Sequence, residues 1–267
     1  DGATPAQQAE VMKKLYDFAG VSAIVSEHDF VAIKVHVGEE GNTTHMKPEV
    51  VRIIVDEVKA KGGLAFLTET STLYKGERSN AVKHLLHAHK MGFGVETMGI
   101  PFIMSDGLLE NSEGKVTING ELHEKVEIAS EIIGTDVIIS VSHVTGHIVT
   151  GLGACIKNLG MGLASKKGKR QQHSSMHPSI KDNCILCRKC MQWCPADAII
   201  EKDKKAWIIQ EKCIGCGECL TACRYDAVGF DWGAEAGYTQ KSMTEHALGV
   251  VKGKKCFFFN LLIDMTK

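Results

Sequence analysis

The sequence predicts an α/β protein with a mostly parallel sheet, flanking helices and an inserted cysteine-rich subdomain of the α+β type. Three observations lead to this prediction. Short apolar strands alternate with helical segments up to residue 177, eight of the ten cysteines fall within residues 184–223, and another apolar strand follows near Phe257. We therefore expect residues 1–177 and 233–267 to form the α/β domain and residues 178–232 to form the insertion.

An amphipathic helix is expected at the amino end. Thr4 and Pro5 are typical of an N-cap and a first helical residue. Three apolar residues then recur on one helical face and predict its buried side: Val11, Leu15 and Phe18.

The first predicted strand covers residues 31–37. Its apolar residues share one side, and Lys34 and His36 share the other side near the carboxyl end. A polar loop with Asn42 and His45 follows, and then a helix with regularly spaced apolar residues begins near Pro48.

A second strand and helix follow in the same order. Residues 64–67 predict the strand, and Ser79 is the expected N-cap of the helix. His84, His87 and His89 lie on this helix, which is rich in lysine and places no carboxylate or cysteine beside them. We therefore expect a solvated surface there rather than a metal site.

Three further segments complete the predicted sheet region. Residues 100–104 should form an edge strand because they include Pro101, and residues 115–122 predict a hairpin with Asn-Gly at its tip. Residues 136–142 are nearly all apolar, which is typical of a strand buried on both faces. We expect this strand at the centre of the sheet.

A glycine-rich stretch, residues 143–162, follows that strand. Open α/β sheets bind ligands beyond the carboxyl ends of their strands, where glycines let the backbone approach an anionic group. The alternatives are plain tight turns for the glycines and a solvated loop for residues 166–170. Gly151 and Gly153 lack the third glycine of a dinucleotide fingerprint, so we do not expect NAD.

Two histidines in this stretch are candidates for chemistry. His143 and His147 directly follow the buried strand, where an imidazole can ligate a metal, move a proton or hold a carboxylate. We predict His143, His147 and Lys157 as catalytic residues. The predicted cofactor-binding residues come from the loops beyond the strands: Lys34, His36, Asn42, His45, Gly151, Gly153, Asn158, Lys167 and His173.

Eight cysteines form two matching runs, and every cysteine interval of the first run recurs 29 residues later. This spacing is that of a bacterial two-cluster ferredoxin, in which the fourth cysteine of each run binds the other [4Fe-4S] cluster. The predicted ligands of one cluster are Cys184, Cys187, Cys190 and Cys223. Those of the other are Cys213, Cys216, Cys219 and Cys194. Arg224 replaces the usual proline after the second run.

Two other uses of the cysteines fit less well. A single zinc ion needs two separated ligand pairs, which three cysteines at two-residue gaps do not offer. A disulfide framework suits a short secreted chain, whereas 267 residues are enough to form a core.

Composition limits the class of protein. Hydrophobic residues make up 44% and charged residues 24%, and the formal net charge is −1. These values are typical of a soluble globular chain and indicate no nucleic-acid partner. No apolar run approaches the roughly 20 residues that span a membrane. Free thiolates for clusters favour a reducing compartment, so we expect a cytoplasmic location.

The motifs outside the cysteine runs resemble a known family over nearly the whole chain. They are residues 31–36, Thr68-Glu69-Thr70, Ser105-Asp106-Gly107, His143, His147, residues 157–162 and His173. This set, followed by the ferredoxin-like unit, resembles the family called domain of unknown function 362. The resemblance implies an iron-sulfur protein whose chemistry is largely unassigned.

The central stretch is also similar to the histidine, glycine-rich and lysine region of the nickel-pincer lactate racemases. That resemblance implies a lysine-tethered cofactor on Lys157, with His143 or His147 and His173 handling protons. This sequence carries extra residues there, and the racemases have no ferredoxin counterpart.

The functional expectation is an oxidoreductase, or a subunit of one, that passes single electrons through two [4Fe-4S] clusters. The electrons would move between a redox protein partner and a cofactor or small-molecule substrate in the α/β domain. We favour a flavin as the cofactor because it converts single electrons into pairs and needs a phosphate site. The alternative is a non-catalytic electron-carrier subunit of a larger complex.

Overall fold

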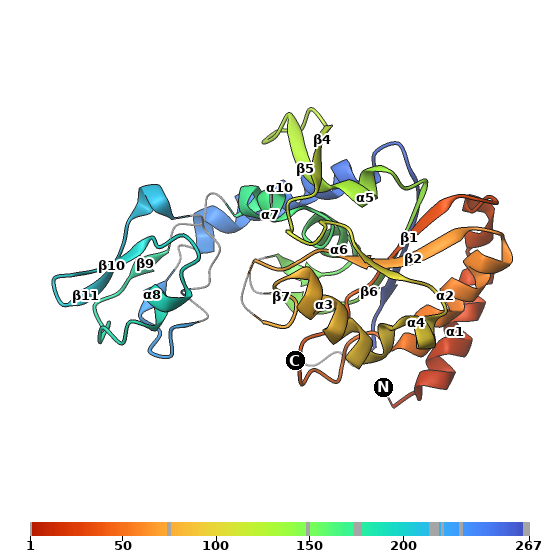
Figure 1. The fold of residues 1–267 in the computed structure, drawn as a ribbon, viewed down its shortest axis with the longest axis horizontal. Coiled ribbons are helices and arrows are strands. Elements are labelled where there is room, and N and C mark those ends of the chain that lie inside the picture. Colours follow the sequence, from red (N-terminus) through yellow and green to blue (C-terminus); the bar gives the residue numbers. More distant parts are fainter. Residues whose placement is uncertain are drawn as a thin grey trace.

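Five parallel strands form the central sheet, in the order β13-β6-β1-β2-β3 (Figure 1). The structure is a computed structural model, and it describes residues 2–73, 76–147, 150–173, 178–213, 219, 222–229 and 232–263. The strands are β1 (Phe30–Lys34), β2 (Leu64–Glu69), β3 (Phe102–Met104), β6 (Val137–His143) and β13 (Lys255–Leu261). The prediction of an α/β fold with a mostly parallel sheet is confirmed.

The central strand of the sheet is not the predicted one but its neighbour. β6 is buried on both faces, as expected, but β1 occupies the middle of the sheet. β2 and β3 lie on one side of β1, and β6 and β13 lie on the other. β3 is an edge strand, as its neighbouring proline predicts.

One face of the sheet is covered by α1 (Pro5–Phe18) and α2 (Pro48–Ala60). Thr4 caps α1 with Pro5 as its first residue, as predicted. The predicted buried face of α1 is wrong, because Phe18 is 93% exposed while Met12 and Tyr16 are fully buried. The ring of Tyr16 stacks on Phe259 of β13, with ring centroids 6.4 Å apart. Contact with the distant last strand therefore sets the orientation of the first helix.

The other face is covered by α6 (Cys155–Gly160), α10 (Trp232–Val251) and a hairpin of β4 (Glu113–Thr117) and β5 (Lys125–Ala129). The hairpin begins and ends outside the predicted residues 115–122. α5 (Ser130–Ile133) follows it. α6 and α10 cross very closely, since a Cβ atom on Gly160 would lie 2.2 Å from the carbonyl oxygen of Met243.

The helix after β2 differs from its predicted environment. α3 (Ala81–Ala88) is capped by Asn80 rather than Ser79 and continues into a π-helical turn, His89–Phe93. His84 is 0% exposed and His87 is 3% exposed, so the expected solvated surface is wrong for both. The helix turns these imidazoles toward the sheet, where each finds a hydrogen-bond partner.

Short elements complete the α/β part: η1 (Val21–Ile24), α4 (Val95–Met98), β7 (Thr145–His147), β8 (Gly151–Gly153) and α7 (Lys166–Gln172). β7 and β8 pair as a small antiparallel hairpin. Residues 166–170 therefore form most of a helix, not the loop that we considered.

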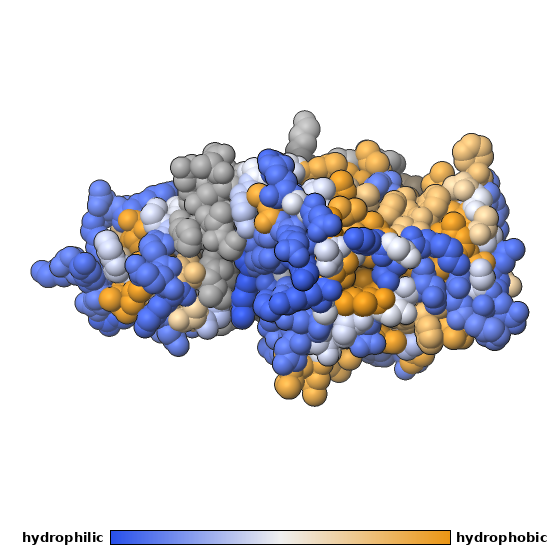
Figure 2. All heavy atoms as spheres, turned by 90° about the horizontal axis from the view of Figure 1, so that it is seen from above, coloured by the Kyte–Doolittle hydropathy of each residue, from blue (hydrophilic) through white to orange (hydrophobic). Residues whose placement is uncertain are grey.

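The cysteine-rich stretch lies at one end of the molecule in Figure 1. It contains β9 (Ser179–Ile180), α8 (Lys189–Trp193), β10 (Ile199–Lys202), β11 (Lys205–Ile208), η3 (Gln210–Lys212) and β12 (Val228–Gly229). β9 pairs with β12 and β10 with β11. After this stretch, β13 joins the main sheet beside β6. Figure 2 shows a mainly hydrophilic surface at this end, with small apolar patches.

Among the described residues, no helix has both the length and the apolar character needed to cross a membrane.

Candidate functional site

A buried ion pair lies at the carboxyl ends of β1 and β2. Lys34 ends β1, and its Nζ is 2.9 Å from Oε1 of Glu69, which ends β2. The parallel register places Lys34 opposite Thr68, so Glu69 lies one residue beyond it. The two side chains are 0% and 4% exposed. Lys34 also donates to the backbone carbonyl of Val35.

The second oxygen of Glu69 contacts two further basic groups. His84 Nε2 lies 2.9 Å from Oε2, and the Arg78 guanidinium lies 3.7 Å from it. Burial opposes ionisation of Glu69, but Lys34 and the hydrogen bond from His84 hold its pKa well below the usual value. Glu69 is therefore a buried carboxylate that joins three basic side chains.

Asn158 of α6 links this ion pair to β6. Its Oδ1 accepts a hydrogen bond from Lys34 at 2.7 Å, and its Nδ2 donates to Ser140 at 3.2 Å and to Ser142 at 3.0 Å. Both serines are buried near the end of β6. Side chains from β1, β2, β6 and α6 thus form one polar network beyond the carboxyl ends of the strands, where open α/β sheets bind ligands.

Lys157 lies next to Asn158 at the edge of this network and is only partly buried. Burial lowers its pKa, and the charges of Arg78 and Lys34 lower it further, against the opposing effect of Glu69. Among the described residues its ammonium has no hydrogen-bond partner. Lys157 is therefore a candidate ligand-binding residue.

Two predicted histidines lie near Lys157. Burial and the Lys157 charge lower the pKa of His147 to about 4, and the same two effects lower the pKa of His173 to about 4. His147 Nδ1 accepts a hydrogen bond from the backbone N–H of Thr150 at 3.1 Å. Both imidazoles are consequently neutral at pH 7.

Of the other predicted site residues, His36 lies beside the network, and Asn42, His45 and His143 contact other groups. His36 has its Nδ1 3.9 Å from Glu69 Oε1 and 48% of its side chain exposed. His45 packs on Gly38, and the Asn42 side chain accepts hydrogen bonds from Thr44. His143 contacts the backbone carbonyl of Ile263.

The glycines and Lys167 also have local roles. Gly151 and Gly153 pair across the β7–β8 hairpin with His147 and Thr145. A Cβ atom on Gly153 would lie 3.6 Å from Lys157 Cδ, so this hairpin adjoins the site. Lys167 is instead exposed and bonded to Glu127 of the β4–β5 hairpin at 2.9 Å, and the structure does not bring it to the other predicted residues.

The sequence prediction missed several members of the network: Glu69, Arg78, His84, Ser140 and Ser142. Lys169 is buried on α7, and its Nζ donates to the carbonyl of Ser71 at 2.6 Å. Burial lowers the pKa of Lys169 to about 7, against the opposing charge of Asp106. A lone acidic residue at the end of an apolar strand, as in Leu64–Glu69, is the signal that points to such a network.

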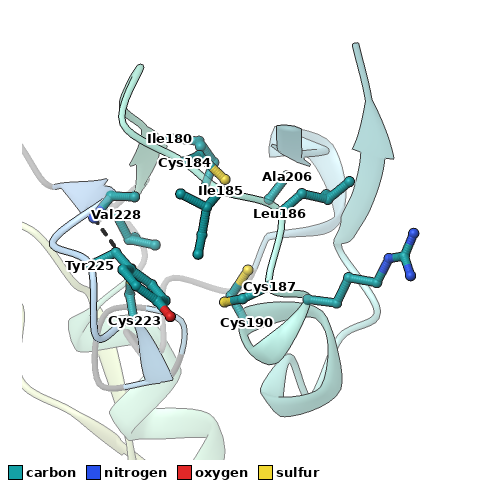
Figure 3. Close-up of a pocket in the computed structure, with 12 residues that line it drawn as sticks. Ile180, Cys184, Ile185, Leu186, Cys187, Cys190, Ala206, Cys223, Tyr225 and Val228 are labelled. Atoms are coloured by element: carbon teal, nitrogen blue, oxygen red, sulfur yellow. Dashed lines mark hydrogen bonds between the residues drawn. The ribbon is translucent and has the colours of Figure 1, made fainter. Parts of the chain in front are cut away.

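A second candidate site is a cavity in the cysteine-rich part (Figure 3). Its lining includes Cys184, Cys187 and Cys190 of the first run together with Cys223 of the second. Apolar side chains from β9, β11 and β12 complete the wall, and Figure 3 shows Cys187 and Cys190 across the cavity from Ile185. The four sulfur atoms are those predicted for one cluster.

The sequence repeat is also a repeat of hydrogen bonds. The backbone N–H of Ala198 donates to Cys194 Sγ at 3.3 Å, and the N–H of Ala227 donates to Cys223 Sγ at 3.3 Å. Each pair is related to the other by the same 29-residue offset. Cys194 and Cys223 therefore occupy equivalent local environments.

The remaining predicted ligands are partly described. Cys219 is buried, and Cys194 and Cys213 pack against the same small apolar core. Cys216 lies outside the described residues. Within the described part of the chain, no three His, Cys, Asp or Glu side chains are grouped to hold one metal ion. A [4Fe-4S] cube is a different arrangement, because each thiolate binds a separate iron.

Comparison with known proteins gives a family but no reaction. The family model described as "Domain of unknown function (DUF362)" matches residues 31–263. No curated protein sequence matches the chain.

Two solved structures are similar in part. One is the lactate racemase apoprotein from Thermoanaerobacterium thermosaccharolyticum, with a TM-score of 0.46 and 11% identity over 82% of this chain and 46% of that one. The other is a structural genomics protein from Thermotoga maritima, with a TM-score of 0.43 and 12% identity over 65% of this chain and 41% of that one. This chain thus spans less than half the length of either structure.

Proposed function

Since the chain belongs to the DUF362 family, whose description assigns no reaction, we propose its function from its two sites. It is an iron-sulfur oxidoreductase, or a subunit of one, in which two [4Fe-4S] clusters pass single electrons to a small-molecule or cofactor site in the α/β part. The observation that carries this proposal is the cavity lined by Cys184, Cys187, Cys190 and Cys223, which come from both runs.

The cysteine-rich part fits the clusters in two respects. Four cysteines line one mainly apolar cavity, and an N–H group donates to the sulfur of each crossing cysteine, Cys194 and Cys223. Hydrogen bonds to sulfur and an apolar surrounding are the means by which a protein sets the potential of a cluster. When bound, each cluster would accept and release one electron at a time.

The α/β site supports an anionic ligand. Lys34, Arg78 and Lys157 lie around the Glu69 carboxylate, and Arg78 also pairs with Glu39, so these three cations exceed the two carboxylates by one charge. Lys157 would bind the anion, and the bound negative charge would offset the Lys157 charge that now disfavours protonation of His147 and His173. A flavin is our candidate for the bound group, because its phosphate would face these cations.

Reconstitution with iron and sulfide without oxygen tests the clusters. We expect about eight irons per chain and the paramagnetic resonance signals of two reduced cubes. Cys223→Ser should damage the cluster of Cys184, Cys187 and Cys190, and Cys194→Ser should damage the other one. Cys256→Ser is the control, because this half-buried thiol lies outside the runs. Retention of both clusters in Cys194→Ser and Cys223→Ser would refute the crossed assignment.

The α/β site has a separate test. Mass spectrometry of the protein purified without oxygen and then denatured should detect a bound anionic molecule. Lys157→Ala should lose this molecule with its iron content unchanged, while Lys167→Ala, which alters an exposed lysine paired with Glu127, should retain it. Equal content in both variants would contradict the proposed site and favour a non-catalytic electron carrier.

A further inference from the structure

The mouth of the cysteine-lined cavity is open to solvent. Cys187 is exposed, and its neighbours Ile185 and Tyr225 are 59% and 48% exposed. All three line the cavity, and Figure 3 shows Ile185 and Tyr225 converging on it from the side opposite Cys187. The rim of a cluster bound here would therefore combine an accessible sulfur ligand with two exposed apolar side chains.

Exposed residues next in sequence to the cavity lining add positive charge beside the rim. Lys181 pairs with Asp226 at 2.9 Å, and Arg188 pairs with Glu201 at 2.8 Å, so these four residues add no net charge. Lys189 and Arg224, which directly precede Cys190 and follow Cys223, have no acidic partner among the described residues. These two cations are exposed at the surface.

The equivalent positions of the second run have other residues. At the 29-residue offset, Tyr225 corresponds to Ala196, Arg224 to Pro195 and Lys189 to Glu218. Tyr225, Arg224 and Lys189 therefore have no residue of the same type at the equivalent positions of the repeat. The duplicated unit has diverged where a partner would contact it.

We propose that this rim is the docking surface for an acidic one-electron carrier protein, so that the cluster held by Cys184, Cys187, Cys190 and Cys223 exchanges electrons with the outside. This inference rests on the proposed function. An electron carrier must approach the cluster closely, and the exposed edge at Cys187 allows this. Ile185 and Tyr225 supply apolar contact area, while Lys189 and Arg224 attract an acidic partner.

The test is stopped-flow reduction of the reconstituted full chain by reduced flavodoxin, a small acidic carrier. Lys189→Glu should lower the second-order rate constant about tenfold at low ionic strength, and high salt should remove the difference. Lys83→Glu is the matched control, because it makes the same charge change at an exposed residue in the first turn of α3, in the α/β part. Its rate constant should equal that of the wild type.

Paramagnetic resonance distinguishes failure of the docking surface alone from failure of the proposed iron-sulfur function. Equal rate constants for Lys189→Glu and Lys83→Glu, with both cluster signals intact, would overturn the docking surface and leave the proposed function standing. Absence of cluster signals from the reconstituted wild type would overturn the proposed function and the docking surface together.

Discussion

At the scale of single residues, the buried charged network depends on Glu69. Its carboxylate bonds Lys34 and His84 and is almost fully buried. Glu69→Gln leaves the Lys34 ammonium without a counter-charge in the interior, so we expect the free energy of unfolding to fall by roughly 3–5 kcal/mol. Urea denaturation measures this loss. Glu10→Gln removes an exposed partner of Lys14 and should leave the midpoint unchanged; equal effects would contradict the argument.

His246 gives a residue-scale prediction of pH dependence. Its side chain is 0% exposed and its Nδ1 donates to the Ser242 carbonyl at 2.7 Å, while burial lowers its pKa to about 4. The unfolded value is about 6.5, so between these values the unfolded chain binds a proton that the folded chain does not. Stability should therefore fall as the pH decreases from 6.5 toward 4.

Urea midpoints at pH 7 and pH 4.5 measure this effect. The full contribution of His246 is at most about 3 kcal/mol, from about 2.5 pKa units. His246→Gln should show a smaller loss between the two pH values than the wild type. His28→Gln changes a histidine that is 81% exposed and should keep the wild-type loss. The same slope in both variants would show that His246 does not contribute.

The sequence predicted those site residues that lie at the end of a strand or in the segment that follows it. Lys34 and Asn158 were found because a strand or glycine-rich stretch places them beyond the sheet, and they bond each other. His84 was missed because its helix is rich in lysine, and only contact with Glu69 identifies it as buried. Arg78 was missed because it comes from an irregular loop, whose path depends on tertiary contacts.

At the scale of elements, periodicity located the helices better than it oriented them. α2 buries the expected apolar residues, because only one of its faces is apolar. α1 carries apolar residues on two faces, and the stacking of Tyr16 on Phe259 selects the face that Val11 and Leu15 do not share. Local spacing contains no information on a strand more than 200 residues away.

The crossing of α6 and α10 can be tested with two glycines. Gly160→Ala would place Cβ 2.2 Å from the Met243 carbonyl oxygen, so the helices must separate and we expect a loss of roughly 1–3 kcal/mol or more. Gly237→Ala lies within α10, where no atom would be within 4 Å of the new Cβ. It should raise stability by about 0.4–1 kcal/mol. Thermal unfolding measures both, and equal losses would contradict the close crossing.

At the scale of the whole molecule, the two parts differ in what stabilises them. The described core of the cysteine-rich part consists of six buried residues, two of them cysteines, whereas the sheet has a large apolar core on each face. If the proposed clusters supply the missing stability, their removal should unfold residues 178–229 first. Hydrogen exchange should then become fast there and stay slow in β1 and β6. Uniform loss of protection would contradict this independence.

The pairing of β13 with β6 has a consequence for synthesis on the ribosome. β6 ends at His143 and its neighbour β13 begins at Lys255, so 111 residues must be translated between them. At about 5–20 residues per second, β6 waits roughly 5–20 s as an uncovered apolar strand. During that interval the nascent chain presents the kind of edge that chaperones bind and that misassembly exploits. Because β13 is translated late, we expect this chain to be most prone to misassembly during translation rather than after folding.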